Sequence, residues 1–266
     1  MRTYLIFLIH FSFFSLAAQN SSLNININDY YESALNLFED GKYDEALSLI
    51  KSGLEESQKL QDKNLIAYGY FYQAKYYEKL GPYTVSVSLY NRALDIFKVL
   101  NNQSQIARCY YKLGFNNFKL SEYDLSLEYY LKSLSIDEIL NNNAGLALTL
   151  ERIGKLYLHT GDFYQARENF EKALAIFIEL NDDFRTLMNK QCVAVTYQKE
   201  AMRYQKDSLF HKAIKIYKEL IPESSKISAA TQASLLQNIG SSYRFLRQYE
   251  KSLEYLFRSL PIQVEL

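Results

Sequence analysis

Apolar side chains recur along this chain at the spacing of one helix face. The clearest stretch places large or small apolar residues at i, i+3, i+4 and i+7: Leu150, Ile153, Gly154 and Tyr157. Gly161 and Asp162 interrupt this pattern, and a second apolar face begins at Phe163. The stretch therefore predicts a hairpin of two helices joined by a short turn.

The predicted hairpin recurs at a fixed step along the chain. One series of small residues marks the first helices: Ala34, Ala74, Gly114, Gly154 and Ala194. A second series with the same step marks the second helices: Ala46, Ser86, Ser126 and Ala166. The second series follows the first at a constant offset, so the two helices of a hairpin should approach closely at these sites. A fixed period of about 40 residues is typical of stacked repeats that present an extended binding surface.

This pattern resembles the tetratricopeptide repeat, in its variety of about 40 residues. The likeness is carried in the fourth repeat by these residues: Leu150, Ile153, Gly154, Tyr157, Gly161, Phe163, Ala166, Phe170 and Ala173. The resemblance implies an all-α, right-handed superhelical solenoid of about six antiparallel helical hairpins, spanning residues 19–266. The expected repeats are 27–62, 63–102, 103–142, 143–182, 183–227 and 228–266.

Two places depart from the regular step. In the fifth repeat Ala213 follows Ala194 at a longer offset, so about seven residues are inserted within 200–207, as a helical arm or as a loop. The last repeat runs to Leu266 without a capping helix, and Pro261 falls inside its predicted second helix. Two interpretations fit this end: a second partner docks there, or the reading frame is a shortened form of a longer protein.

The N-terminus has the pattern of an export signal. Arg2 is followed by an apolar run from Tyr4 to Phe14 and then by small residues. We expect residues 1–18 to be a signal peptide cleaved near Ala17 or Ala18, so that the protein is periplasmic or secreted in a bacterium. An uncleaved anchor is the alternative, although the run is shorter than the ~20 residues that span a bilayer.

The net charge and the few histidine and cysteine residues exclude several classes of function. Thirty basic and thirty acidic residues give a formal net charge of +0, so no overall field draws the chain to nucleic acid or an anionic membrane. After signal removal only His159 and His211 remain, in different repeats, so no metal, cofactor or catalytic site is expected. Cys109 and Cys192 lie two repeats apart, and no disulfide between them is expected.

The resemblance also implies that the first helices line a concave groove. The residues expected there are Tyr68, Phe71, Lys75, Arg108, Tyr111, Lys112, Phe115, Glu151, Arg152 and Lys155. Cations beside aromatic rings can hold a carboxylate and a flat or apolar side chain together, which suits an extended acidic peptide. The alternative is an ordinary solvated surface, on which Glu151 pairs with Lys155 at i+4.

The sequence therefore predicts an exported scaffold, not an enzyme, that binds a protein or peptide on its concave face. Arrays of this kind led by a signal peptide also resemble the sensory segments of bacterial signalling regulators. The alternative function is thus a ligand-receiving segment that ends before its membrane and output domains. An enzyme would need acid, base or metal groups that converge in the groove, and the sequence offers none.

Overall fold

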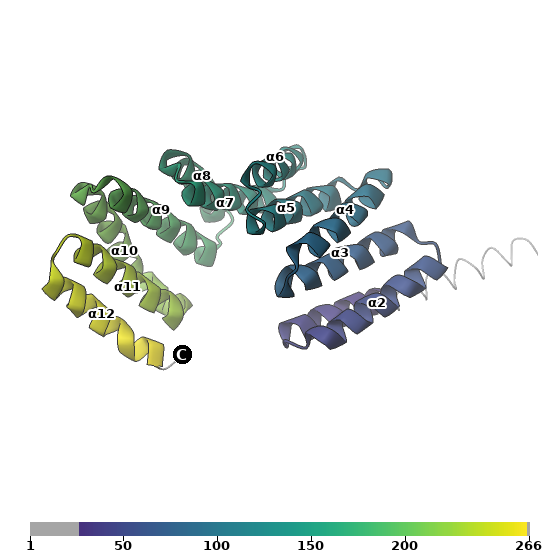
Figure 1. Cartoon of the computed structure of the whole chain (residues 1–266), viewed down its shortest axis with the longest axis horizontal. Coiled ribbons are helices and arrows are strands. Elements are labelled where there is room, and N and C mark those ends of the chain that lie inside the picture. Colours follow the sequence, from purple (N-terminus) through teal and green to yellow (C-terminus); the bar gives the residue numbers. More distant parts are fainter. Residues whose placement is uncertain (1–26, 265–266) are drawn as a thin grey trace, which may run out of the picture. The chain divides into compact units, whose positions relative to one another are not determined.

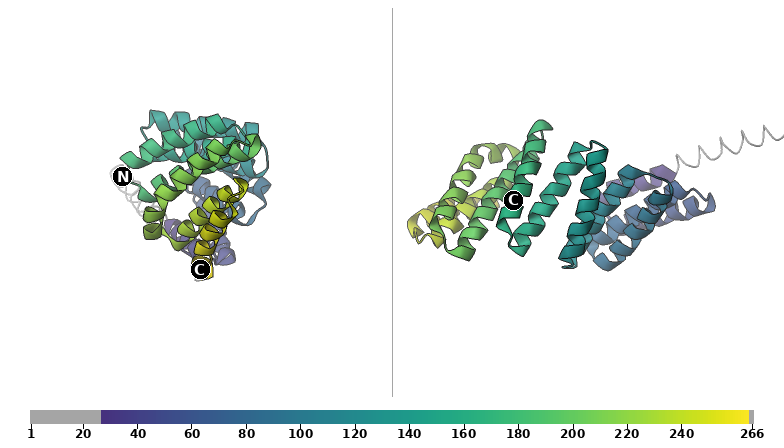
Figure 2. Two further views of the ribbon diagram at one scale, coloured as in Figure 1. Left: turned by 90° about the vertical axis from the view of Figure 1, so that its left-hand side faces the viewer. Right: turned by 90° about the horizontal axis from the view of Figure 1, so that it is seen from above.

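The computed structural model describes residues 27–264, and every regular element in this part of the chain is an α-helix (Figure 1 and Figure 2). The first helix covers residues 27–39. The others are α2 (Tyr43–Lys59), α3 (Lys63–Leu80), α4 (Tyr83–Val99), α5 (Gln103–Lys119), α6 (Tyr123–Ile139), α7 (Asn143–Thr160), α8 (Phe163–Glu179), α9 (Asp183–Tyr204), α10 (Asp207–Ile227), α11 (Ala229–Phe245) and α12 (Tyr249–Val264). They form antiparallel hairpins, which confirms the all-α prediction. The expected signal peptide, residues 1–18, lies outside the described residues.

The chain divides into two compact units. Unit 1 ends at Ile136 and unit 2 begins at Asp137, so the division falls within α6. Each unit has its own buried core of aromatic and aliphatic side chains. The core of unit 1 includes Phe71, Tyr90, Phe97 and Leu113, and that of unit 2 includes Leu187, Tyr217, Leu235 and Ile239.

The turns recur at a constant step over the regular part of the chain. From residue 41 to residue 181, each turn contains one residue with a positive φ angle: Gly41, Gln61, Gly81, Asn101, Ser121, Asn141, Gly161 and Asn181. Between hairpins, the next residue caps the following helix; the Asp62 side chain, for example, accepts a hydrogen bond from the Leu65 backbone N–H at 3.0 Å. Such a cap contributes about 1 kcal/mol. The short turn predicted at Gly161 and Asp162 is confirmed, because it joins α7 to α8.

The two series of small residues do meet. The Ser86 hydroxyl donates to the Ala74 carbonyl at 2.9 Å, and the Ser126 hydroxyl donates to the Gly114 carbonyl at 2.7 Å. A Cβ atom on Gly154 would lie only 2.8 Å from the Phe170 ring. The close approach predicted from the constant offset of the two series is therefore confirmed.

The insertion in the fifth repeat is helical. Helix α9 is the equivalent of α7 one repeat later. Since α7 ends at Thr160, α9 would end at residue 200 if the repeat were regular, yet it continues to Tyr204. Helix α10 begins at Asp207, ahead of Phe210, which occupies the place that Phe163 holds at the start of α8. The turn between the two helices stays as short as in the other repeats. Of the two readings of the insertion, the helical arm is correct.

Helix α12 passes through Pro261 and continues to Val264, so the proline does not end the last helix. One face of this helix carries four large apolar side chains that are each at least 50% exposed: Tyr249, Leu253, Phe257 and Leu260. Within residues 27–264, no helix combines the length and the apolar character that a bilayer crossing requires.

Candidate functional site

Three of the predicted cations lie on α3 and α5 of unit 1: Lys75, Arg108 and Lys112. Lys75 is half-buried and makes no hydrogen bond or ion pair with the described residues. Burial lowers the pKa of Lys75, the positive charges of Lys112 and Arg108 lower it further, and the charge of Glu78 acts in the opposite direction. Because a bound anion would favour the charged ammonium, Lys75 is suited to contact a carboxylate.

Aromatic rings lie on the same helices as these cations, and one of the rings contacts Arg108. Tyr68 and Tyr72 stack with their centroids 6.3 Å apart, and the Arg108 guanidinium lies 5.0 Å from the centre of the Phe71 ring. Phe71 itself is only 2% exposed, because its ring packs edge-on against Tyr90 at 5.2 Å. The expectation that Phe71 contacts a ligand is therefore corrected: it supports Arg108 from the core.

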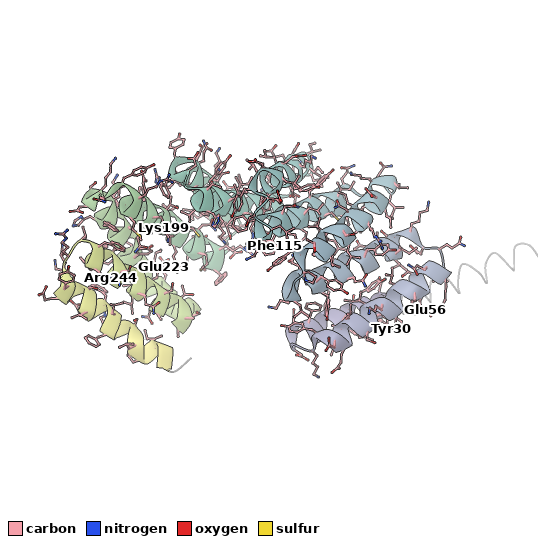
Figure 3. The ribbon with its side chains drawn as sticks, viewed as in Figure 1. Tyr30, Glu56, Phe115, Lys199, Glu223 and Arg244 are labelled. Atoms are coloured by element: carbon pink, nitrogen blue, oxygen red, sulfur yellow. The ribbon has the colours of Figure 1, made fainter. Side chains whose placement is uncertain are left out.

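The remaining predicted residues of unit 1 lie farther along α5. Tyr111 is half-buried and tilted against Tyr130, with 6.0 Å between the ring centroids. Phe115, labelled in Figure 3, is also half-buried, and the Lys119 ammonium lies 5.5 Å from the centre of its ring. Both rings therefore keep part of their surface accessible beside the cations.

Glu78 is an acid that hydrogen-bonds to one of these cations, and it was not among the residues predicted from the sequence. Its carboxylate accepts hydrogen bonds from Lys112 at 2.7 Å, from Asn116 at 3.1 Å and from Tyr90 at 3.0 Å. Lys112 is thereby paired. The Glu78 carboxylate is bound by one donor from its own repeat and by two from the next repeat. Among the three cations, Lys75 remains the one without a partner in the described part of the chain.

A neutral version of this clamp occurs in unit 2. Gln198 occupies the place in its repeat that Glu78 holds three repeats earlier. It accepts from the Tyr217 hydroxyl at 3.1 Å and donates to the Ser242 hydroxyl at 2.9 Å. The shared place in the repeat is the signal that could have identified Glu78 as an inter-repeat contact. It also shows that the contact does not require a charge.

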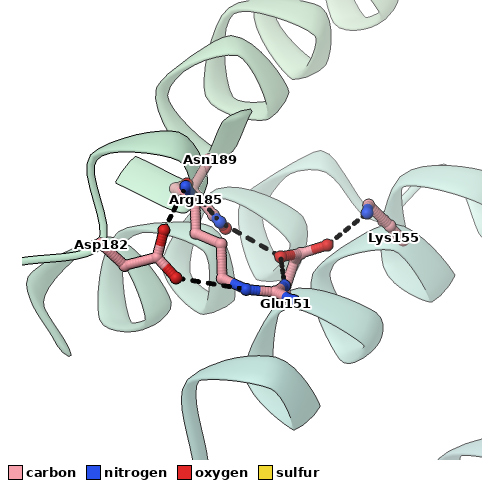
Figure 4. A network of polar contacts seen from close by, with 5 residues as sticks. All are labelled: Glu151, Lys155, Asp182, Arg185 and Asn189. Atoms are coloured by element: carbon pink, nitrogen blue, oxygen red, sulfur yellow. Dashed lines mark hydrogen bonds and ion pairs between the residues drawn. The ribbon is translucent and has the colours of Figure 1, made fainter. Parts of the chain in front are cut away.

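The predicted residues of unit 2 form a closed network (Figure 4). Glu151 is buried and pairs with Lys155 on the same helix. Asn189 donates to the other carboxylate oxygen at 3.3 Å, and the Arg185 guanidinium lies 3.7 Å from that oxygen. The i,i+4 pair of Glu151 with Lys155 is thus present, but Glu151 is buried and does not lie on the solvated surface that the alternative assumed. Arg152 adds a further positive charge near Glu151.

The network makes stability depend on pH. Burial alone raises the pKa of Glu151, but the hydrogen bond and charge of Lys155, with Asn189 and Arg152, hold it below its ordinary value. A lowered folded-state pKa contributes stability above the unfolded value of about 4.3, and this contribution is lost as pH falls through the folded value. We expect Glu151→Gln to lower the free energy of unfolding at pH 7 by about 1–3 kcal/mol.

Urea denaturation at pH 7 and pH 3 measures this effect. The difference between Glu151→Gln and the unaltered protein should shrink at pH 3. The matched control is Glu168→Gln, which removes an exposed i,i+4 pair with Lys172 and should cost at most about 0.5 kcal/mol. An equal loss at both pH values would contradict a charged Glu151.

The two cysteines outside these clusters have unreactive thiols. Cys109 and Cys192 are both free, as their positions predict, and burial raises their pKa values to about 12 and about 11. Their thiols are therefore protonated at neutral pH and poor nucleophiles. Within residues 27–264, no group of three His, Cys, Asp or Glu side chains is arranged to hold a metal ion.

The ten predicted site residues thus fall into two sets. Seven lie in unit 1 and three in unit 2. The unit 1 set combines an unpaired cation with partly accessible rings. The unit 2 set satisfies its own charges. No curated protein matches the sequence significantly.

The fold is similar to that of several solved structures. The apo form of RapI is 19% identical with a TM-score of 0.62, over 90% of this chain and 97% of RapI. A Rap protein complexed with competence and sporulation factor is 18% identical with a TM-score of 0.58, over 89% and 74%. A signal transduction ATPase with a tetratricopeptide repeat sensor, from Pyrococcus horikoshii, is 16% identical with a TM-score of 0.73, over 90% and 37%. At such identities the likeness shows the fold alone.

Family models add evidence from the sequence. One model of the tetratricopeptide repeat matches residues 65–139 and 105–179, and a second matches residues 233–260. Together they cover more than half of the 266 residues. The helical hairpins, the small residues at their contacts and these matches agree. The chain belongs to the tetratricopeptide repeat proteins.

Proposed function

We propose that this protein is an exported interaction scaffold that binds an acidic peptide segment on the surface formed by α3 and α5 of unit 1. The observation that carries this proposal is Lys75, a half-buried ammonium without an ion-pair partner among the described residues, next to Lys112 and Arg108. Holding like charges together in a partly buried place costs stability, and an anionic ligand offsets that cost.

The neighbouring side chains set the kind of peptide. Arg108 is held on the Phe71 ring and keeps an exposed side chain that can contact a second carboxylate. Tyr68, Tyr72 and Tyr111 supply partly accessible rings for a flat or apolar side chain of the ligand. Acidic residues next to an aromatic residue are therefore the favoured ligand sequence.

Lys75→Met should weaken the binding of such a peptide about tenfold, because methionine keeps the bulk and removes the charge. The ligand is obtained by selecting random displayed peptides on the intact protein, and its affinity is measured by fluorescence anisotropy at two salt concentrations. The same substitution should raise the melting temperature, since it removes a partly buried cation that Lys112 and Arg108 repel.

Lys63→Met is the matched control, because Lys63 is exposed at the start of α3. It should change neither the affinity nor the melting temperature. Selected peptides without acidic residues, or an affinity that Lys75→Met leaves unchanged, would overturn the proposed site.

Export is the second part of the proposal. It rests on the sequence of residues 1–18, with a positive start, an apolar run and small residues at the expected cleavage site. Sequencing the N-terminus of the mature protein tests it. Placement in the periplasm or outside the cell follows only if that terminus begins near Ala18 or Gln19.

A sensory function is the second candidate. It is favoured by the similarity in fold to the tetratricopeptide repeat sensor of the signal transduction ATPase. In that case the peptide bound by unit 1 would be the signal, and a membrane or DNA-binding regulator would receive it. Pull-down from the cell envelope separates the two candidates: a sensor should retain one regulator in a ligand-dependent way, whereas a scaffold should retain its ligand's parent protein.

A further inference from the structure

One position of the repeat changes character along the chain. The same place on α3, α5, α7 and α9 is occupied by four residues that are one repeat apart: Tyr70, Tyr110, Leu150 and Lys190. The first three are apolar or aromatic, and the fourth is a lysine. The contacts that this position makes in an earlier repeat therefore indicate which contacts are missing from the fifth repeat.

In unit 1 this position is filled by a ring. Tyr110 on α5 stacks on Tyr129 of α6, with 6.0 Å between their centroids. The ammonium groups of Lys98 and Lys132 each lie 5.7 Å from the centre of the Tyr110 ring. The ring thus occupies the space beside the second helix and is flanked by cations.

In unit 2 the corresponding space is a cavity of about 370 Å³, at the small end of ligand-binding pockets. Its apolar walls come from three helices: Leu174 of α8, Val193 of α9, and Ile216 and Leu220 of α10. Ile216 occupies the place of Tyr129 once the insertion is counted. Lys190 lines the cavity but supplies no ring to fill it.

The rim of the cavity is acidic, with three glutamates: Glu171, Glu219 and Glu223. Glu219 has only a long, exposed ion pair with Lys215 at 4.0 Å. Glu171 and Glu223 make no ion pair with the side chains that the structure describes, which do not include those of residues 225–227; Figure 3 labels Glu223. Glu219 occupies the place that Lys132 holds beside the Tyr110 ring. Both the ring and the Lys132 cation beside it are therefore replaced by other residue types in the fifth repeat.

We propose that this cavity binds an aromatic or large aliphatic side chain of a partner segment that carries lysine or arginine on both sides. The apolar side chain takes the place that Tyr110 fills in the third repeat. The flanking cations pair with Glu171 and Glu223. This ligand has the opposite charge to the one proposed for the α3 and α5 surface, so the two sites are independent and one can fail without the other.

The probe is a fluorescein-labelled peptide with a central phenylalanine and two lysines on each side, and binding to the full chain is followed by anisotropy at low salt. Lys190→Tyr restores the residue type of the third repeat and fills the cavity. It should weaken binding at least tenfold. A probe with alanine at its centre should bind the unaltered protein about fivefold more weakly, and Lys190→Tyr should bind both probes equally.

Lys199→Tyr is the matched control, since Lys199 is an exposed lysine on the same helix and does not line the cavity. It should bind the phenylalanine probe as the unaltered protein does. Circular dichroism melts verify that each variant is folded. The double variant Glu171→Gln, Glu223→Gln provides a second test that leaves the cavity open, and it should reduce both the affinity and its dependence on salt.

Three results would overturn the proposal. The first is equal affinity of the phenylalanine and alanine probes for the unaltered protein, which would mean charge attraction without use of the cavity. The second is unchanged binding by Lys190→Tyr. The third is self-association in sedimentation that Lys190→Tyr abolishes, which would make a second copy of this chain the occupant.

Discussion

Phe170→Ala should lower the free energy of unfolding by about 3–5 kcal/mol, the largest loss expected from a single change in unit 2. Phe170 is 0% exposed and packs with Ala166 and Val193. Alanine leaves a cavity there that the surrounding helices can only partly close. Urea denaturation followed by circular dichroism measures the loss. The matched control is Phe184→Ala, because Phe184 is 52% exposed and should cost at most about 1 kcal/mol.

The reason for the loss can be tested separately. A side chain at Gly154 would meet the Phe170 ring, so Gly154→Leu alone should overpack the hairpin at a cost of about 1–3 kcal/mol. Combined with Phe170→Ala, the leucine can enter the vacated space. The double variant should therefore lose less than the sum of the two single losses. Strict additivity would contradict direct packing of these two positions.

Glu78→Ala should destabilise unit 1 by about 3 kcal/mol, because one carboxylate satisfies three donors at once. Its removal leaves the Lys112 ammonium, the Asn116 amide and the buried Tyr90 hydroxyl without their acceptor. Denaturation at neutral pH measures the loss.

The control for this prediction is Glu128→Ala. Glu128 also pairs with a lysine, Lys132, but the pair is exposed on α6 and should contribute about 0.5 kcal/mol or less. If Glu78→Ala cost no more than Glu128→Ala, the inter-repeat clamp would not hold neighbouring repeats together.

The hairpins and turns could be predicted because their causes are local in the sequence. The constant offset of the two series of small residues reports a contact within one hairpin, which Ser86 and Ala74 make. The i,i+4 pair of Glu151 and Lys155 is local in the same sense.

The difference between the predicted residues of unit 1 and those of unit 2 could not be predicted in this way. Lys155 is neutralised within a network that includes Asn189 from the next repeat, whereas Lys75 has no such partner among the described residues. Phe71 is covered by Tyr90 from the next helix, so its place on the helix face alone does not reveal its burial. These contacts depend on which residue an adjacent helix brings to the same place.

The insertion in the fifth repeat could be predicted in part: its position and length, but not its structure. Its length of about seven residues, close to two helical turns, keeps the apolar face in phase whether the added residues are helical or looped. The structure distributes them over the end of α9 and the start of α10 and leaves the turn between these helices short. Phase alone therefore cannot choose between an arm and a loop.

The second to fifth repeats carry their own start and stop signals for folding. The capping residues Asp62, Asn102, Asn142 and Asp182 begin the first helices, and the residue before each of them reverses the chain with a positive φ angle. A duplicated segment would thus arrive with both of its ends already stabilised. A gene built from such segments could gain or lose whole repeats by recombination. Selection would then need to adjust only the side chains at the new junctions between repeats.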